Sequence, residues 1–125
     1  MARSPLVQNE TGNPTPAAPV WTVDLNSYVL ASNVSVAAGA RTPILENVPG
    51  GYYAINTEAV SWTNVSLKLQ FLARSGNWRD VVDGSGNPII WTANGVKRGP
   101  IGANSTLSLL NTGAATANGV YSDAS

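Results

Sequence analysis

The stretch VSLKLQFL, residues 65–72, alternates apolar and polar side chains from Val65 to Phe71. Successive residues of an extended chain point to opposite faces, so such an alternation gives one apolar face and one polar face. The apolar members are Val65, Leu67, Leu69 and Phe71. One buried face and one solvated face are typical of a half-buried β-strand, and the stretch therefore predicts one.

The same period appears on both sides of this stretch. YYAINTEAVSW (52–62) and STLSLLN (105–111) alternate in the same way. Weaker strands are predicted for VWTVDL (20–25), YVLA (28–31), VSVA (34–37), TPILENV (42–48), NWRDVV (77–82), PIIWTA (88–93), GVKRG (95–99) and GVYS (119–122). No window of the chain has the apolar spacing of an amphipathic helix.

Turn residues separate these segments. They recur about every 8 to 12 residues, a spacing typical of an antiparallel sandwich or jelly roll. The predicted turns are Ala38-Gly39, Pro49-Gly50-Gly51, Ser75-Gly76-Asn77, Asp83 to Asn87, Asn94-Gly95 and Gly99-Pro100. We therefore expect an all-β protein, an antiparallel β-sandwich or jelly roll with an extended N-terminal arm.

The arm is predicted for residues 1–19 and the sandwich domain for residues 20–125. Proline keeps a chain extended and excludes it from helices and central strands, and four of the eight prolines lie in the arm. Two interpretations stay open: a disordered leader, or an arm that becomes ordered on a neighbouring subunit. Its candidate contact residues are Pro5, Leu6, Val7, Pro14, Pro16 and Pro19.

The composition excludes several classes of function. Seven basic and seven acidic residues cancel, and charged residues make up only 11% of the chain, so no basic stripe is available for nucleic acid. The absence of cysteine and histidine removes thiolate ligands, the commonest zinc ligand and any Ser-His-Asp triad. No apolar run reaches the length of a membrane span, and we do not expect residues 1–12 to be a secretory signal. We expect synthesis in the host cytoplasm and no cofactor.

Two carboxylates, Asp80 and Asp83, are the candidate pair for acid–base chemistry. They lie three residues apart on a predicted strand and its turn, so nothing brings them to one face. Asp83 opens DGSGN, where a side chain that accepts hydrogen bonds from its own turn is the commoner role. The same segment lacks the further carboxylates of a calcium loop. We predict no catalytic residues and no metal site.

Four tryptophans, at positions 21, 62, 78 and 91, are the other candidate site. Tryptophan most often seals the rim or the core of a small sandwich, and this is the favoured interpretation. The alternative is a flat platform for a glycan, formed by Trp78 and Trp91 on neighbouring strands.

Two long segments carry a resemblance to known proteins. They are GGYYAINTEAVSWTNVSLKLQFLARSGNWRDV (50–81) and WTANGVKRGPIGANSTLSLLNTGAATANGVYS (91–122). Together they resemble small β-sandwich virion proteins of tailed bacteriophages, in the Gly-Tyr strand, the central alternating strand, the TANG turn and the closing GVYS strand. The resemblance implies a capsid decoration (cement) protein, and it brings no catalytic motif.

The expected function is therefore structural. A cement protein that binds and stabilises the phage head shell needs a rigid body and surfaces to bury, and no reactive group. The expected partners are the major capsid protein and copies of the chain itself, as a dimer or trimer, with no nucleic acid and no membrane. The expected location is the capsid surface of the virion. The alternative is a tail-fibre or host-surface module that binds glycans, and we do not expect an enzyme.

Overall fold

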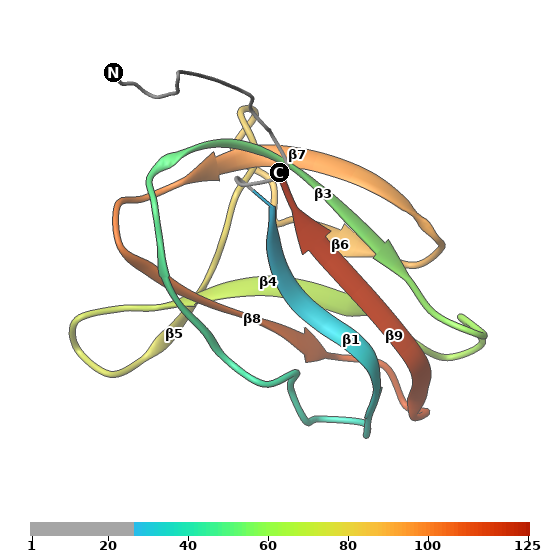
Figure 1. Cartoon of the computed structure of the whole chain (residues 1–125). Helices are drawn as coiled ribbons and strands as arrows, with labels where there is room; N and C mark the ends of the chain where they lie inside the picture. The colour runs from blue at the N-terminus through green and yellow to red at the C-terminus, as the bar shows by residue number, and fades with distance from the viewer. Residues whose placement is uncertain (1–26) are drawn as a thin grey trace, which may run out of the picture.

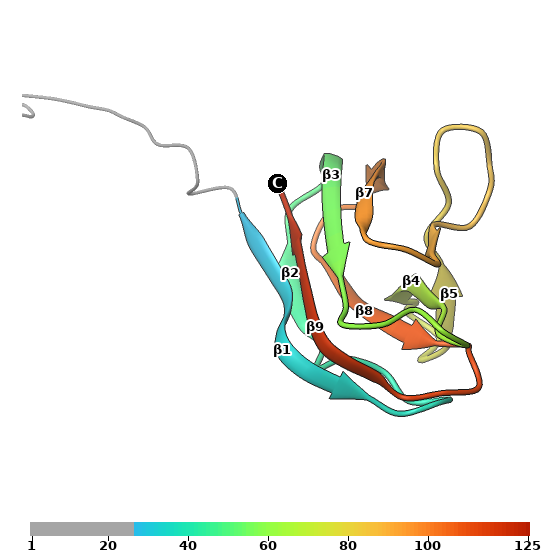
Figure 2. The same cartoon turned by 90° about the vertical axis from the view of Figure 1, so that its right-hand side faces the viewer.

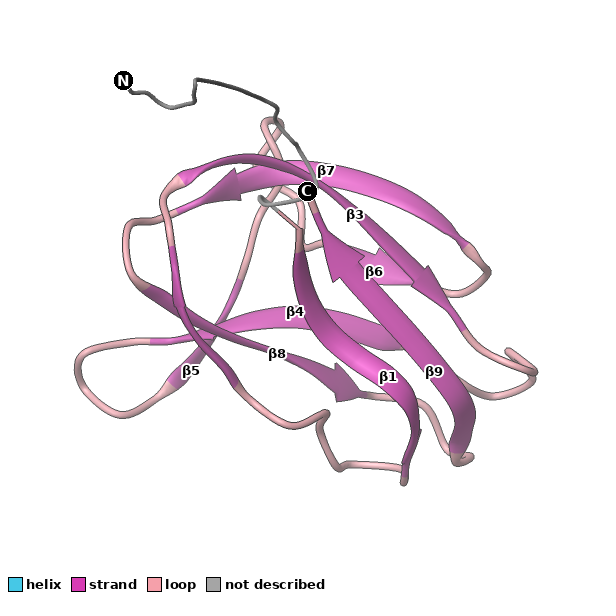
Figure 3. Ribbon diagram, viewed as in Figure 1, coloured by secondary structure: helices cyan, strands magenta, loops and turns pink. Residues whose placement is uncertain are grey.

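The computed structural model describes residues 27–125, and in this part of the chain every regular element is a β-strand. The strands form two antiparallel sheets packed face to face (Figures 1 and 3). They are β1 (Tyr28–Val36), β2 (Leu45–Val48), β3 (Gly51–Glu58), β4 (Leu67–Leu72), β5 (Trp78–Asp80), β6 (Ile90–Trp91), β7 (Gly95–Ile101), β8 (Ser105–Asn111) and β9 (Ala117–Ala124). The prediction of an all-β sandwich is confirmed.

One sheet has four strands in the spatial order β1-β9-β3-β7. The other has five strands: four lie in the order β2-β8-β4-β5, and the short β6 also pairs with β4. Most connections between consecutive strands cross from one sheet to the other, and they can be followed in the turned view of Figure 2. Strands distant in sequence, such as β1 and β9, therefore lie side by side.

The alternating stretch that predicted the fold lies at the centre of the five-stranded sheet as β4. Leu67 and Leu69 are completely buried. Across the strand pair, Leu69 lies opposite Leu109 of β8 and Phe71 lies opposite Leu107. Burial of each such aliphatic side chain stabilises the fold by about 1.5–3 kcal/mol, so this layer forms much of the core.

Polar side chains within the core have hydrogen-bond partners there. The hydroxyls of Thr57 on β3 and Ser122 on β9 lie 2.9 Å apart, on strand positions directly opposite each other. Asn111 of β8 is fully buried, and its amide donates to the carbonyl oxygens of Val36 (2.9 Å) and Ala115 (2.8 Å). A buried polar group with its partners in place avoids a desolvation penalty of about 1–3 kcal/mol.

Three predicted elements differ in the structure. The alternating stretch 52–62 is a strand only as far as Glu58. YVLA and VSVA are not separate strands but parts of β1, whose pairing with β9 shifts register at several points and includes Asn33 at φ 52°. The turn predicted at Gly99-Pro100 is wrong, because both residues lie inside β7. An edge strand tolerates proline, since its outward N–H has no partner to lose; β7 pairs only with β3.

The turn predicted at Asp83 is confirmed. Its carboxylate Oδ1 accepts hydrogen bonds from the backbone N–H groups of Ser85 (2.8 Å) and Asn87 (3.0 Å). Gly86 in the same turn has φ 84°, a conformation that favours glycine. The predicted strand 20–25 and the contact residues of the arm, Pro5, Leu6, Val7, Pro14, Pro16 and Pro19, lie outside the described residues.

Candidate functional site

The two tryptophans of the proposed glycan platform lie on opposite faces of the five-stranded sheet. Both β5 and β6 pair with the same edge of β4, where Trp78 is opposite Leu72 and Trp91 is opposite Leu67. Residues directly opposite in an antiparallel pair point to the same face. Leu67 is buried in the core and Leu72 faces solvent, so Trp91 points inward and Trp78 outward.

Trp78 and Trp91 therefore do not form the predicted glycan platform. Trp91 is completely buried, and its indole Nε1 donates to the carbonyl oxygen of Gly95 at 3.0 Å. Trp62 packs against both core clusters and donates from Nε1 to Asn94 Oδ1 at 2.7 Å. The structure confirms the packing interpretation for these two tryptophans, while Trp21 lies outside the described residues.

Trp78 belongs to a polar cluster on the outer face of the five-stranded sheet. The guanidinium of Arg41 lies 4.0 Å from the centre of the Trp78 ring, and Arg41 Nη2 donates to Gln70 Oε1 at 3.1 Å. Arg41 reaches this position from beside β8, where it forms an isolated bridge with Leu110. Burial beneath its neighbours lowers the pKa of the guanidinium. One face of the indole is thus already covered by a cation, a contact worth about 0.5–1 kcal/mol at such a site.

The cluster continues across β4 to β5. Gln70 Nε2 donates to Asp80 Oδ1 at 2.9 Å, and Lys68 Nζ lies 3.2 Å from the same carboxylate oxygen. The hydrogen bond from Gln70, followed by the interactions with Lys68, holds the pKa of Asp80 below its usual value. The alternation of β4 predicted that Lys68 and Gln70 share its outer face, but the sequence carried no signal that Arg41 would join them.

The pH dependence of stability follows from this carboxylate. Its pKa is lower in the folded than in the unfolded chain, so the Asp80 carboxylate stabilises the fold above the ordinary aspartate pKa of 3.8. That contribution disappears as the pH falls from 3.8 through the lower folded pKa. We expect Asp80→Asn to be less stable than the wild type in urea at pH 7, and the two to converge at the acid end. A stability difference that stays constant down to pH 2 would contradict this.

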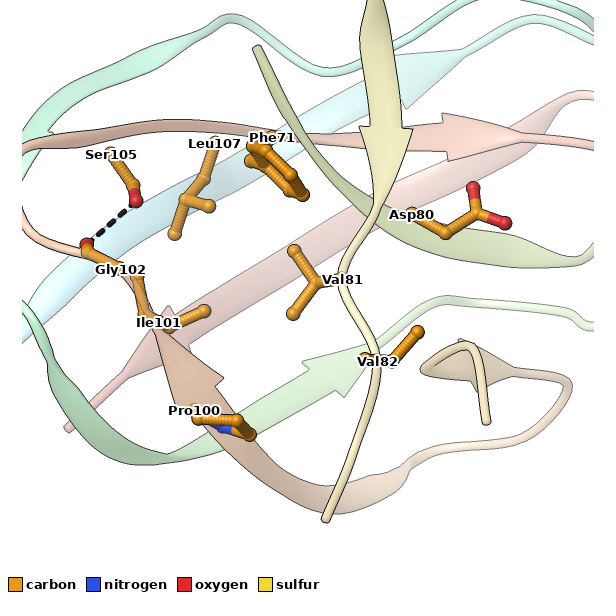
Figure 4. A pocket seen from close by; sticks show the side chains of 9 residues that line it. All are labelled: Phe71, Asp80, Val81, Val82, Pro100, Ile101, Gly102, Ser105 and Leu107. Carbon is orange, nitrogen blue, oxygen red and sulfur yellow. Dashed lines mark hydrogen bonds between the residues drawn. The ribbon is translucent and has the colours of Figure 1, made fainter. Parts of the chain in front are cut away.

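An apolar pocket of about 210 Å³ opens between the two sheets, where β7 faces the chain that follows β5. Figure 4 shows the side chains of Phe71, Val81 and Leu107 directed toward one another there. The complete lining is Phe71, Asp80, Val81, Val82, Pro100, Ile101, Gly102, Ser105 and Leu107.

The polar groups at this pocket are engaged elsewhere. The Ser105 hydroxyl donates to the carbonyl oxygen of Gly102 at 2.7 Å, and the Asp80 carboxylate binds Gln70 and Lys68. An apolar cavity of about 150 Å³ is enough to hold benzene. The pocket therefore suits an apolar group and presents no acid–base pair. Within residues 27–125 there is also no group of three side chains arranged to hold a metal ion.

Exposed apolar side chains gather on the outer face of the four-stranded sheet. Val29, Tyr52, Val96 and Tyr121 are between 47 and 67% exposed, and they come from all four strands of this sheet. The strand register places all of them on one face. Alternate residues of β3, represented by Ile55, are buried against the core, so the residues between them, and their partners on the neighbouring strands, point outward. Sequence reasoning missed this surface, since single exposed apolar residues on separate strands carry no signal before the pairing is known.

Three ionic side chains share this face with the apolar ones. The ionic side chains that share it are Glu58 on β3, Arg98 on β7 and Asp123 on β9. The amide of Asn56 donates to Glu58 Oε2 at 3.1 Å. The outer face of the four-stranded sheet is thus a mixture of aliphatic, aromatic, neutral polar and charged groups, and its tyrosines are of a type enriched in protein–protein interfaces.

Comparison of the chain with protein-family models, curated proteins and solved structures finds no match. The resemblance to virion proteins of tailed phages therefore stays a prediction that depends on the two quoted segments. Within the described residues, no helix has the length and apolarity needed to cross a membrane.

Proposed function

We propose that the protein is a structural virion protein, which decorates and stabilises a phage head shell by burying its outer sheet surface against the major capsid protein. The observation that carries the proposal is the outer face of the four-stranded sheet. Its exposed apolar side chains, Val29, Tyr52, Val96 and Tyr121, extend across the full width of the sheet.

The arrangement of this face supports a broad protein partner. One row across the sheet contains Val29, Asp123, Asn56 and Val96, so the two valines stand on the two outermost strands. Tyr52 adds an aromatic side chain that is 67% exposed, and tyrosine is enriched in interface cores. A rigid sheet keeps these groups in place before binding, which lowers the entropic cost of association.

Repetition makes such a surface effective on a shell. A stable interface buries about 1,200–2,000 Å² in total, and a shell offers many identical sites, so a moderate interface at each site adds to a large total stabilisation. Oligomers of the protein gain further affinity, because several copies attach at once. Charged residues make up only 11% of the chain and their charges cancel, so attachment is expected to change little with ionic strength.

The test is binding of the purified full chain to head shells that lack it, with occupancy measured by quantitative mass spectrometry. We expect Val96→Glu to weaken attachment by at least about 30-fold, the effect of losing roughly 2 kcal/mol when a charge is placed within the buried contact surface. Ile44→Glu is the matched control, because Ile44 is also 51% exposed but precedes β2 at the edge of the other sheet.

Three results would contradict the proposal. They are equal occupancy of the two glutamate variants, a steep loss of wild-type occupancy between 50 and 500 mM salt (roughly a threefold change in Debye length), and only a few copies per particle. Deletion of residues 1–19 in the same assay tests the arm, and we expect it to reduce occupancy.

The glycan-binding alternative is not favoured by a specific observation. Its platform is not formed, since Trp91 is buried and Arg41 covers one face of Trp78.

A further inference from the structure

The apolar pocket between the two sheets has a buried floor and an exposed mouth (Figure 4). Its floor consists of core residues that are at most 5% exposed: Val81, Ile101 and Leu107. Its mouth is bordered by residues that reach solvent: Val82, Pro100 and Gly102. A ligand can therefore contact the core side chains of the floor without any strand having to move.

The polar side chains of the lining are engaged within the protein. The Ser105 hydroxyl donates to the carbonyl oxygen of Gly102 at 2.7 Å. The Asp80 carboxylate points away from the apolar side chains of the pocket in Figure 4, and it binds Gln70 and Lys68. A charged or polar group that entered the pocket would lose its hydration without gaining a partner, and this costs free energy. The occupant is therefore neutral and apolar.

The size of the pocket favours a side chain of a protein over a free small molecule. Sites for small molecules usually measure about 300–1,000 Å³ and contain a few free polar groups that fix the orientation of the ligand. This pocket measures about 210 Å³, which is enough for a six-membered ring, since about 150 Å³ holds benzene. A side chain needs no polar group in the pocket, because the backbone of its own protein fixes its orientation. Buried tyrosine and tryptophan usually need a hydrogen-bond partner, so the lining favours phenylalanine.

The mouth of the pocket adjoins the outer face of the four-stranded sheet. Pro100 at the mouth lies opposite Tyr52 of β3, and directly opposite residues share a face. Tyr52 is 67% exposed and belongs to the surface that supports the proposed function. A partner that covers this surface therefore also reaches the pocket.

We propose that the pocket receives a phenylalanine side chain of the major capsid protein, which anchors the contact made by the outer face of the four-stranded sheet. This inference rests on the proposed function and adds the apolar anchor to it. Aromatic side chains that fill a pocket at an interface are among the few residues that contribute most of the binding free energy.

The pocket is tested first on the full chain alone, with N-acetyl-phenylalanine amide as the probe and two-dimensional NMR as the measurement. We expect saturable shifts of the backbone amide signals of Val81, Val82 and Ile101, with a dissociation constant in the millimolar range. N-acetyl-glycine amide, which lacks the ring, should leave these signals unchanged. If the phenylalanine probe does not shift them, the proposal is overturned.

Gly102→Leu fills the mouth of the pocket and should raise the dissociation constant of the probe at least about tenfold. The substitution suits the fold, because Gly102 has no positive φ and a Cβ there would meet only Ser105 Oγ, at an ordinary 3.5 Å. Gly84→Leu is the matched control, since a Cβ at Gly84 would meet no atom within 4 Å and Gly84 does not line the pocket. Equal binding of the probe by the two variants would place it elsewhere and overturn the proposal.

Head shells then identify the source of the side chain. We expect Gly102→Leu to attach at least about tenfold more weakly than Gly84→Leu, while urea unfolding gives the two variants similar midpoints. If Gly102→Leu attaches as strongly as Gly84→Leu and Val96→Glu does not attach, the anchor is overturned and the proposed function is retained. If the wild-type chain does not attach to shells at all, the proposed function is overturned together with its anchor.

Discussion

Replacement of Trp91 by alanine is expected to lower the free energy of unfolding by about 3–5 kcal/mol, the usual cost of truncating a fully buried aromatic side chain. Trp91 is completely buried in the main core cluster. Its removal leaves a cavity in that cluster and leaves the carbonyl oxygen of Gly95 without the indole donor. The measurement is urea denaturation followed by circular dichroism, with the loss seen as a lower midpoint at an unchanged slope.

Trp78→Ala is the matched control for this prediction. Trp78 is half-buried on the outer face of the same sheet, and its main specific contact is the guanidinium of Arg41. We expect a cost of about 1 kcal/mol, in line with one partly exposed cation–π contact and a small loss of packing. If the two variants were equally destabilised, the assignment of Trp91 to the core and Trp78 to the surface would be wrong.

The difference between these two tryptophans could not be predicted from the sequence. Alternation over six or more residues assigns a face, and β4 was assigned correctly for this reason. β5 and β6 have only three and two residues, so neither contains enough of the period to show which side chain points inward. Their faces are set by pairing with Leu72 and Leu67, and this register is a tertiary property.

Turns were predictable where one residue determines the backbone. Asp83 binds its own turn, and Gly39, Gly76 and Gly86 adopt the positive φ angles that Gly-containing turns require. The Gly99-Pro100 turn was mispredicted, because the same residue pair is tolerated on an edge strand. The sequence does not reveal that β7 is an edge strand until the strand order is known.

The proposed binding surface was unpredictable for a related reason. Val29 and Val96 lie 67 positions apart in the sequence and meet in one row of the sheet only through the pairing of four strands. Arg41 likewise reaches Gln70 and Trp78 across several strands. Local patterns therefore predicted the fold class, whereas the surfaces depend on contacts between distant segments.

Gly113→Ala is expected to cost 3 kcal/mol or more, at the upper end of the usual range for overpacking (about 1–3 kcal/mol). A Cβ at this position would lie 2.8 Å from the Cα of Val65 and would collide with the carbonyl oxygen of Asn64. These are backbone atoms, which cannot rotate aside like the end of a side chain. The segments around Gly113 and Asn64 would have to separate, and thermal and urea unfolding would both report the loss.

Separation at this point would break more than one contact. The N–H of Gly113 donates to Asn111 Oδ1 at 2.9 Å, and Ala115 N–H donates to the same Asn64 carbonyl at 3.0 Å. Asn111 in turn holds the end of β1 through the Val36 carbonyl. Gly84→Ala is the control, because its Cβ would meet no atom within 4 Å, and it should change stability by less than about 1 kcal/mol. A Gly113→Ala chain as stable as Gly84→Ala would mean that the two segments approach each other less closely than described.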